Sequence, residues 1–193
     1  MEKEKMDRRV RKTKSLLLQC LLQLMEEKDV KDISVKELAD LADINRGTFY
    51  LHYSDIYDML SKVEDELFVE FENILGRTMK CELKAISPRD TLLDIFSFVN
   101  RHRDVVRVMV GPHGDLSFVN RLKDTVKEHI SRLLEPGRSA YYYAYVESFI
   151  VSGCAGVVET WLTEPFPPTP EEMSLLCSSM LEKGLSLLQE PQG

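Results

Sequence analysis

The sequence predicts an all-α protein of about nine helices, with a small N-terminal helix-turn-helix domain and a larger C-terminal helical domain. Apolar residues recur at spacings of three and four along most of the 193-residue chain, which is the period of an amphipathic helix. Helix-start signals stand at Ser34, Ser87 and Thr169, each with an acidic residue three positions further on. No stretch alternates apolar and polar residues as a half-buried strand would, so no sheet is expected.

The first 25 residues are expected to form one amphipathic helix with a basic beginning. Residues 1–14 carry seven Lys or Arg and three Asp or Glu. An apolar face follows, made by Leu17, Leu21, Leu24 and Met25. We expect residues 8–14 to lie along nucleic-acid phosphates and residues 1–5 to be a solvated helix end, because short charge runs are common on solvated surfaces.

A short helix is predicted directly after Ser34. Ser34 and Glu37 form a capping box, in which the hydroxyl accepts a helix-start N–H and the carboxylate reaches back. Apolar residues from Val35 to Ala42 then fall at i, i+3, i+4 and i+7, so one side of this helix packs inward.

A turn and a second helix follow. Asp43 tolerates turn and left-handed conformations, and Asn45 is suited to cap a helix. Ile44 and Phe49 can hold this helix against its partner, which leaves the polar residues of 46–50 facing outward. Such a pair of helices places the start of its second helix in the DNA major groove. Small helical domains also show this pattern without touching nucleic acid, so a protein-interaction module that does not bind DNA is the competing hypothesis.

The run from Val35 to Tyr53, followed by Asp58-Met-Leu60, resembles the DNA-binding domain of the tetracycline-repressor (TetR) family. The resemblance covers about residues 8–67. It implies that Gly47–Tyr50 is the recognition helix and that Tyr53 closes the small helical domain.

The resemblance also implies the residues that contact DNA. Arg46, Gly47 and Thr48 would approach bases, and Tyr50 and His52 would contact phosphate. The full set expected at the DNA is Ser34, Lys36, Asn45, Arg46, Gly47, Thr48, Tyr50, His52 and Tyr53. Two positions depart from the family pattern: the turn glycine is Asp43, and the lysine that commonly opens the fourth helix is Ile56. An aspartate can occupy the αL region, whereas Ile56 removes a phosphate contact.

Composition is that of an ordinary globular chain, with 44% hydrophobic and 30% charged residues. The net charge of −7 argues against a protein that coats DNA, and the acid lies mainly after residue 53. The four cysteines are widely spaced, without a C-x-x-C pair, so reduced thiols are expected. No apolar run reaches the roughly 18 residues of a membrane span and no export signal is visible, so we expect a cytoplasmic protein.

The C-terminal part is expected to begin with a long connecting helix from residue 56 to about residue 79. Further helices are predicted to start at or near Ser87, Asp104, Asp115, Tyr141 and Thr169. The predicted division is a DNA-binding domain at 8–54, extending to about 67 with the connecting helix, and a regulatory and dimerisation domain at 55–193.

The last two helices are expected to form a homodimer. Apolar residues on the final helix fall on one stripe: Met173, Leu176, Cys177, Met180, Leu187 and Leu188. The preceding helix carries small residues at 152–156 and apolar area at Val151, Val158 and Trp161. Two such pairs can meet as a four-helix bundle, an arrangement that the resemblance also implies. Both helices could instead simply complete the core of one chain.

An unidentified small effector is expected in an aromatic cavity among the middle helices. The candidate ligand-binding residues are Phe96, His102, Met109, Phe118, Tyr142 and Trp161. For any one of these residues, an ordinary core or surface position is an equal alternative. His102 and His113 lack the spacing of metal ligands, so neither a metal nor another cofactor is expected. No nucleophile or phosphate-loop motif is present, so catalysis is not expected.

The function predicted from the sequence is that of a ligand-responsive transcriptional repressor. It would bind a pseudo-palindromic operator in double-stranded DNA as a homodimer, and a small effector would release it.

Overall fold

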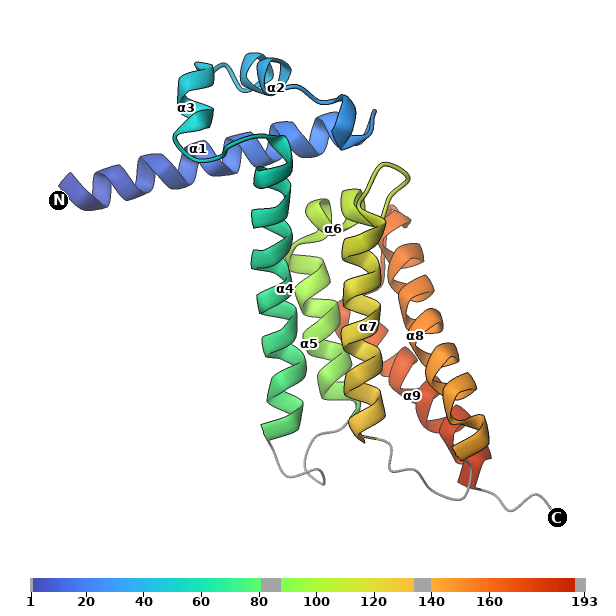
Figure 1. Ribbon diagram of the computed structural model, residues 1–193. Helices are drawn as coiled ribbons and strands as arrows, with labels where there is room; N and C mark the ends of the chain where they lie inside the picture. The colour runs from blue at the N-terminus through green and yellow to red at the C-terminus, as the bar shows by residue number, and fades with distance from the viewer. Residues whose placement is uncertain (1, 81–87, 134–139, 190–193) are drawn as a thin grey trace. The chain divides into compact units, whose positions relative to one another are not determined.

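The computed structural model describes residues 2–80, 88–133 and 140–189, with side chains described for 8–77, 88–132 and 144–183 (Figure 1). Within these ranges the chain forms nine α-helices and one 3₁₀ turn and contains no strand. The predicted all-α fold with an N-terminal helix-turn-helix is therefore confirmed. Contacts divide the chain into two compact units. The N-terminal unit comprises Met1–Glu66 with Val108–Leu116, and the C-terminal unit comprises Leu67–Arg107 with Ser117–Gly193.

The N-terminal unit is built around a small apolar core. Its elements are α1 (Glu2–Met25), the turn η1 (Val30–Asp32), α2 (Val35–Leu41), α3 (Arg46–Tyr50) and the first part of α4 (Ile56–Lys80). Both α1 and α3 pack against α2. The largest of the almost wholly buried side chains in this unit are Leu17, Leu21, Met25, Leu38, Phe49, Met59 and Met109. They include residues from the apolar face predicted for each of the first three helices, whereas Val35 and Ile44 are only half-buried.

A segment distant in sequence, residues 108–116, completes the N-terminal unit. The Nδ1 atom of His113 lies 2.7 Å from a carboxylate oxygen of Asp29, next to η1. The second oxygen of Asp29 accepts from the Lys31 ammonium at 2.9 Å. Lys31 and then His113 hold the pKa of Asp29 below its usual range. This segment is therefore held by contacts 84 positions away in the chain.

The C-terminal unit is a helical bundle (Figure 1). It contains the remainder of α4 together with α5 (Pro88–Arg101), most of α6 (Arg103–Met109), α7 (Leu116–Leu133), α8 (Ala140–Thr163) and α9 (Pro170–Gln189). Helices α5 and α9 pack along one another. Aromatic side chains fill the interior, with Phe96 edge-on to Trp161 at 5.3 Å and Phe71 at 5.8 Å from Phe98 between ring centroids.

One arginine secures the end of α8. The Arg103 guanidinium donates to the carbonyl oxygens of Trp161 at 2.8 Å and Leu162 at 3.1 Å, which are helix-end groups without an intrahelical partner. The same guanidinium lies 5.2 Å from the centroid of the Trp161 ring. The Trp161 indole N–H donates to the carbonyl of Pro168 at 2.8 Å, just before α9 begins. This cluster fixes the α8–α9 connection.

The helix starts agree with the sequence signals where the structure describes them. Thr169 and Glu172 exchange the two hydrogen bonds of a capping box, at 2.8 and 3.3 Å. The predicted cap Ser87 lies outside the described residues. None of the described helices is long and apolar enough to cross a membrane.

Candidate nucleic-acid interface

Helix α2 begins with the predicted capping box. The Ser34 hydroxyl accepts the backbone N–H of Glu37 at 3.2 Å. The Glu37 carboxylate is paired with the Lys28 ammonium and also meets the backbone N–H of Ser34. These contacts lower the pKa of Glu37, with Lys28 the larger cause. Leu38 and Ala39 are fully buried on the inner face.

The turn between α2 and α3 depends on two polar residues. Asp43 has a φ of 49°, the left-handed conformation in which the family carries glycine, so the expectation for this position is confirmed. The N–H of Ile44 then donates to the carbonyl of Ala39 at 3.0 Å. Asn45 caps α3, because its side-chain oxygen accepts the N–H of Gly47 at 2.8 Å. The turn thus fixes the angle at which α3 leaves α2.

Helix α3 has one buried and one exposed face. Phe49 is completely buried and anchors the helix to the core. Tyr50 is 57% exposed, and its ring stands edge-on to Phe49 at 5.5 Å. Arg46 and Gly47 are exposed and Thr48 is half-buried. A short helix therefore presents a guanidinium, a phenol and a side-chain-free position to the outside.

Tyr53 is buried, unlike the other candidate DNA-binding residues. It is only 6% exposed, and its ring packs 5.6 Å from Phe49. The ammonium groups of Lys14 and Lys62 lie 5.9 and 5.3 Å from the ring centroid, from two different helices. Burial raises the pKa of its hydroxyl. Tyr53 thus joins α1, α3 and α4, which is the closing role that the resemblance implies.

The start of α4 is capped by a pair of aspartates. Asp55 accepts the N–H of Asp58 at 2.8 Å, and Asp58 accepts the N–H of Ser54 at 2.8 Å. Lys62 donates to Asp58 at 2.8 Å, which with the Ser54 N–H lowers the pKa of Asp58. Ile56 is 4% exposed, so at this departure from the family pattern the side chain packs into the core.

The other candidate residues lie at the surface of the same unit. Ser34, Lys36 and Asn45 are exposed, and His52 is half-buried with its carbonyl accepting from Lys62 at 3.3 Å. The basic part of α1 is also exposed, at Arg8, Arg9, Arg11, Lys12 and Lys14. Cationic and hydrogen-bonding groups are what a surface needs to bind phosphates and base edges.

The six candidate effector residues were predicted to line one cavity, and the structure does not bring all of them together. Phe96, Phe118 and Trp161 are buried in the C-terminal unit, and Phe96 contacts Trp161. His102 packs 5.0 Å from Phe98 and pairs with Glu70 at 2.8 Å. Met109 is buried but belongs to the N-terminal unit, and the side chain of Tyr142 lies outside the described residues. Their predicted role in binding an effector stays a prediction.

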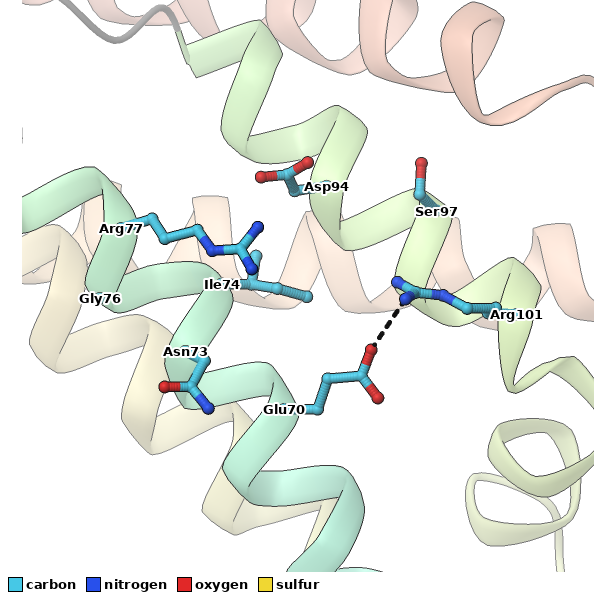
Figure 2. A pocket seen from close by; sticks show the side chains of 8 residues that line it. All are labelled: Glu70, Asn73, Ile74, Gly76, Arg77, Asp94, Ser97 and Arg101. Atoms are coloured by element: carbon cyan, nitrogen blue, oxygen red, sulfur yellow. Dashed lines mark ion pairs between the residues drawn. The ribbon is translucent and has the colours of Figure 1, made fainter.

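A hollow of about 400 Å³ lies in the C-terminal unit between α4 and α5. Its walls are mainly polar and charged, and Figure 2 shows side chains from both helices around it. The lining residues are Glu70, Asn73, Ile74, Gly76, Arg77, Asp94, Ser97 and Arg101. Glu70 pairs with Arg101 at 3.1 Å. No cluster of three or more potential metal ligands occurs in the described ranges.

None of the hollow's residues was among the predicted site residues, although the sequence carries a signal for them. Polar residues recur at i, i+3 and i+7 on both helices, at Glu70, Asn73 and Arg77 and at Asp94, Ser97 and Arg101. This spacing places three residues on one face of each helix. This polar spacing does not by itself predict a hollow, because a polar stripe on a helix is most simply a solvated face.

Exposed apolar residues gather on α8 and α9. Tyr145 and Phe149 on α8 are 67% and 75% exposed, and Leu176 and Met180 on α9 are 52% and 60% exposed. A Cβ atom added at Gly153 or Gly156 would meet nothing within 4 Å. The stripe predicted on α9 is in fact divided, because Met173 and Cys177 are buried within the chain while Leu176 and Met180 face outward. Trp161 is buried too, so it offers no area to a second chain.

The family model described as a transcriptional regulator C-terminal region, of the TetR type, matches residues 87–183, half of the chain. Two relatives come from Bacillus subtilis strain 168. The uncharacterized HTH-type transcriptional regulator YxbF is 25% identical over 164 residues, which cover 81% of this chain and 41% of YxbF. The uncharacterized HTH-type transcriptional regulator YuxN is 21% identical over 198 residues, which cover 92% of this chain and 65% of YuxN. This chain thus spans less than two thirds of either relative.

A solved structure has the same fold. The TetR-like transcriptional regulator from Rhodococcus sp. RHA1 superposes with a TM-score of 0.66, at 17% identity, over 90% of this chain and 96% of its own. The family model matches residues 87–183, and the capped helix-turn-helix of the N-terminal unit precedes this stretch. This chain therefore belongs to the TetR family of transcriptional regulators.

Proposed function

We propose that the protein is a transcriptional repressor that binds a pseudo-palindromic operator as a homodimer and leaves it when a small effector binds. The observation that carries the proposal is the outward polar face of α3, held by the Asn45 cap and the buried Phe49. A reading helix must be rigid on its inner side and exposed on its outer side, and α3 meets both requirements.

In this proposal the residues at the surface of the N-terminal unit divide the contacts with DNA. Arg46, Gly47 and Thr48 approach base edges, where a guanidinium can bind guanine through two hydrogen bonds. Tyr50, His52 and Lys36 contact phosphates beside the groove, and Ser34 and Asn45 place the helix starts toward the backbone. Tyr53 acts through its neighbours, because its ring is buried and orders Lys14 and Lys62.

The proposed division of labour follows the order of the chain. Residues 8–54, extended to about 67 by α4, would form the DNA-binding domain, and residues 55–193 would regulate it and form the dimer. The exposed apolar residues of α8 and α9 support the dimer, because large apolar side chains exposed on a helix suit an interface between copies. The two copies of α3 would enter successive major grooves roughly 34–36 Å apart.

An effector would act through α4, which is one continuous helix from Ile56 to Lys80. A ligand that favours one arrangement of this helix changes operator affinity by about 1–3 kcal/mol, and by linkage operator DNA weakens ligand binding by the same factor.

The test is binding to duplex DNA taken from the sequence flanking the protein's own gene. Fluorescence anisotropy at several salt concentrations would measure affinity for the full chain and for Arg46→Ala and Tyr50→Ala. We expect each substitution to weaken binding by about 1–3 kcal/mol, and affinity to fall with salt. Tyr57→Ala is a matched control, because Tyr57 is 56% exposed and stands outside the proposed contact set.

The competing function is that of a helical module that binds protein and not DNA. Two observations favour it: Ile56 is buried where the family carries a lysine, and the net charge is −7. Equal, weak binding of the parent chain and both variants at low salt would overturn the repressor proposal in favour of this one.

A further inference from the structure

We infer that the hollow between α4 and α5 binds a small zwitterion, a molecule with one carboxylate and one ammonium group such as a free amino acid. Binding is a property of the C-terminal unit itself, but the role of the zwitterion as effector rests on the proposed function. The inference follows from the charges that line the hollow, the pairing of those charges and a glycine in its wall (Figure 2).

The hollow holds two positive and two negative side chains. Arg101 is engaged by Glu70 at 3.1 Å, and the second oxygen of Glu70 is engaged by His102 at 2.8 Å. Arg77 and Asp94 face the same space from opposite helices, and neither has an ion-pair or hydrogen-bond partner among the residues that the structure describes. The hollow is thus lined by one guanidinium and one carboxylate that no other described side chain neutralises.

The chemistry of these two groups selects the ligand. A guanidinium binds a carboxylate through two parallel hydrogen bonds, so Arg77 can take the carboxylate. Asp94 is an acceptor that suits an ammonium group. A simple anion would leave Asp94 without a partner and a metal cation would face two guanidinium groups. A long apolar ligand would find only Ile74 as an apolar side chain in the wall.

Gly76 gives independent support, because glycine is unfavourable in the middle of a helix. It lies within α4 and in the wall of the hollow, and a Cβ atom added there would meet nothing within 4 Å. Packing therefore does not require glycine at this position. A missing side chain does widen the hollow and lets a ligand approach the backbone of α4.

Ligand binding at this place would join the two helices. The ligand's carboxylate would be held from α4 and its ammonium from α5, so the bound state fixes how the C-terminal half of α4 lies on α5. Helix α4 begins three residues after Tyr53, and its first part belongs to the N-terminal unit. A ligand that constrains the C-terminal half of α4 therefore acts on a helix that also forms part of the proposed DNA-binding domain.

The experiment uses the full chain and isothermal titration with the standard L-amino acids. Each amino acid that binds is compared with its N-acetyl derivative and its carboxamide, which lack the ammonium and the carboxylate charge respectively. We expect at least one amino acid to bind with a Kd below about 10 mM, and each derivative to bind at least about tenfold more weakly. Arg77→Gln should abolish binding, and Asp94→Asn should remove the preference for the free amino group.

Two further variants keep the test decisive. Gly76→Leu should fill the hollow and abolish binding while circular dichroism and thermal unfolding stay those of a folded protein, because open space receives the side chain. Arg89→Gln is the matched control, since Arg89 is an exposed arginine of α5 outside the hollow, and it should bind as the parent does.

The inference is overturned if no amino acid binds below about 10 mM, or if Arg77→Gln and Gly76→Leu bind as the parent does. Operator binding measured without ligand separates the two proposals. If the protein binds the operator but no zwitterion, only the inference is overturned. If it binds a zwitterion but no operator, only the proposed function is overturned. If both bind and the zwitterion leaves operator affinity unchanged, the hollow is a ligand site but not the effector site.

Discussion

Two glycines show how much one side chain can decide in this protein. At Gly114 a Cβ atom would lie 1.9 Å from the carbonyl oxygen of Met109 and 2.7 Å from that of Val108. Both neighbours are backbone atoms, so the turn that ends α6 cannot yield by moving a flexible side chain. At Gly76 the same atom would meet open space. One glycine is required by close approach of the backbone, and the other is not required by packing.

The same substitution at the two positions should therefore have opposite effects on stability. We expect Gly114→Ala to lower the free energy of unfolding by about 1–3 kcal/mol or more, because the backbone must shift to admit the methyl group. Gly76→Ala should raise the free energy of unfolding by about 0.5–1 kcal/mol, because alanine favours the helix. Urea denaturation of both variants measures this, and equal signs would show that the turn at 111–114 can rearrange.

A buried histidine should make stability depend on pH. Burial disfavours the imidazolium form of His129 and, with Arg132 as a lesser cause, lowers its pKa below the usual value. As pH falls below about 6.5 the unfolded chain takes up this proton before the folded one, so acidification destabilises the fold. We expect unfolding free energy to decline between pH 7 and pH 5, and to decline less in His129→Leu. Identical pH slopes in the two proteins would exclude His129 as the cause.

At the scale of the element, α3 is the part that depends most on its neighbours. Five residues are too few to hold a helix in water, so α3 exists because Asn45 caps it and Phe49 anchors it. The stability of α3 and its proposed contact with DNA can be separated at the cap, because aspartate caps as well as asparagine but adds a negative charge.

Substitutions at Asn45 should show this separation. We expect Asn45→Ala to lower the free energy of unfolding by about 0.5–2 kcal/mol and to weaken DNA binding as well. Asn45→Asp should keep the stability of the parent chain and still weaken DNA binding, because its carboxylate would face phosphates. Chemical denaturation and anisotropy on the same samples give both quantities. Parent-like DNA affinity in Asn45→Asp would place α3 away from the DNA.

At the scale of the whole molecule, assembly is the property on which operator recognition depends in our proposal. Met180→Glu should place a charge beside the exposed Leu176 of α9, shift sedimentation toward the monomer and weaken operator binding. Val69→Glu is the control, because Val69 is comparably exposed, at 56%, but lies on α4. A monomer in both the parent and the Met180→Glu protein would mean that this surface does not join two copies.

The sequence by itself determined the class of fold, the helix starts that the structure describes and the exposed polar face of α3. These features depend on neighbours within four positions: a cap and its N–H, an apolar stripe, or a residue such as Asp43 that can enter the left-handed region. Such short-range relations are present in the chain before it folds.

Only the tertiary structure decided the features that join distant parts of the chain. It divided the α9 stripe into a buried and an exposed side, brought residues 108–116 to Asp29, and set the polar faces of α4 and α5 around one hollow. The physical reason is that a side chain's periodicity tells which face of its helix it occupies. Periodicity does not tell which other helix, or open space, that face will meet.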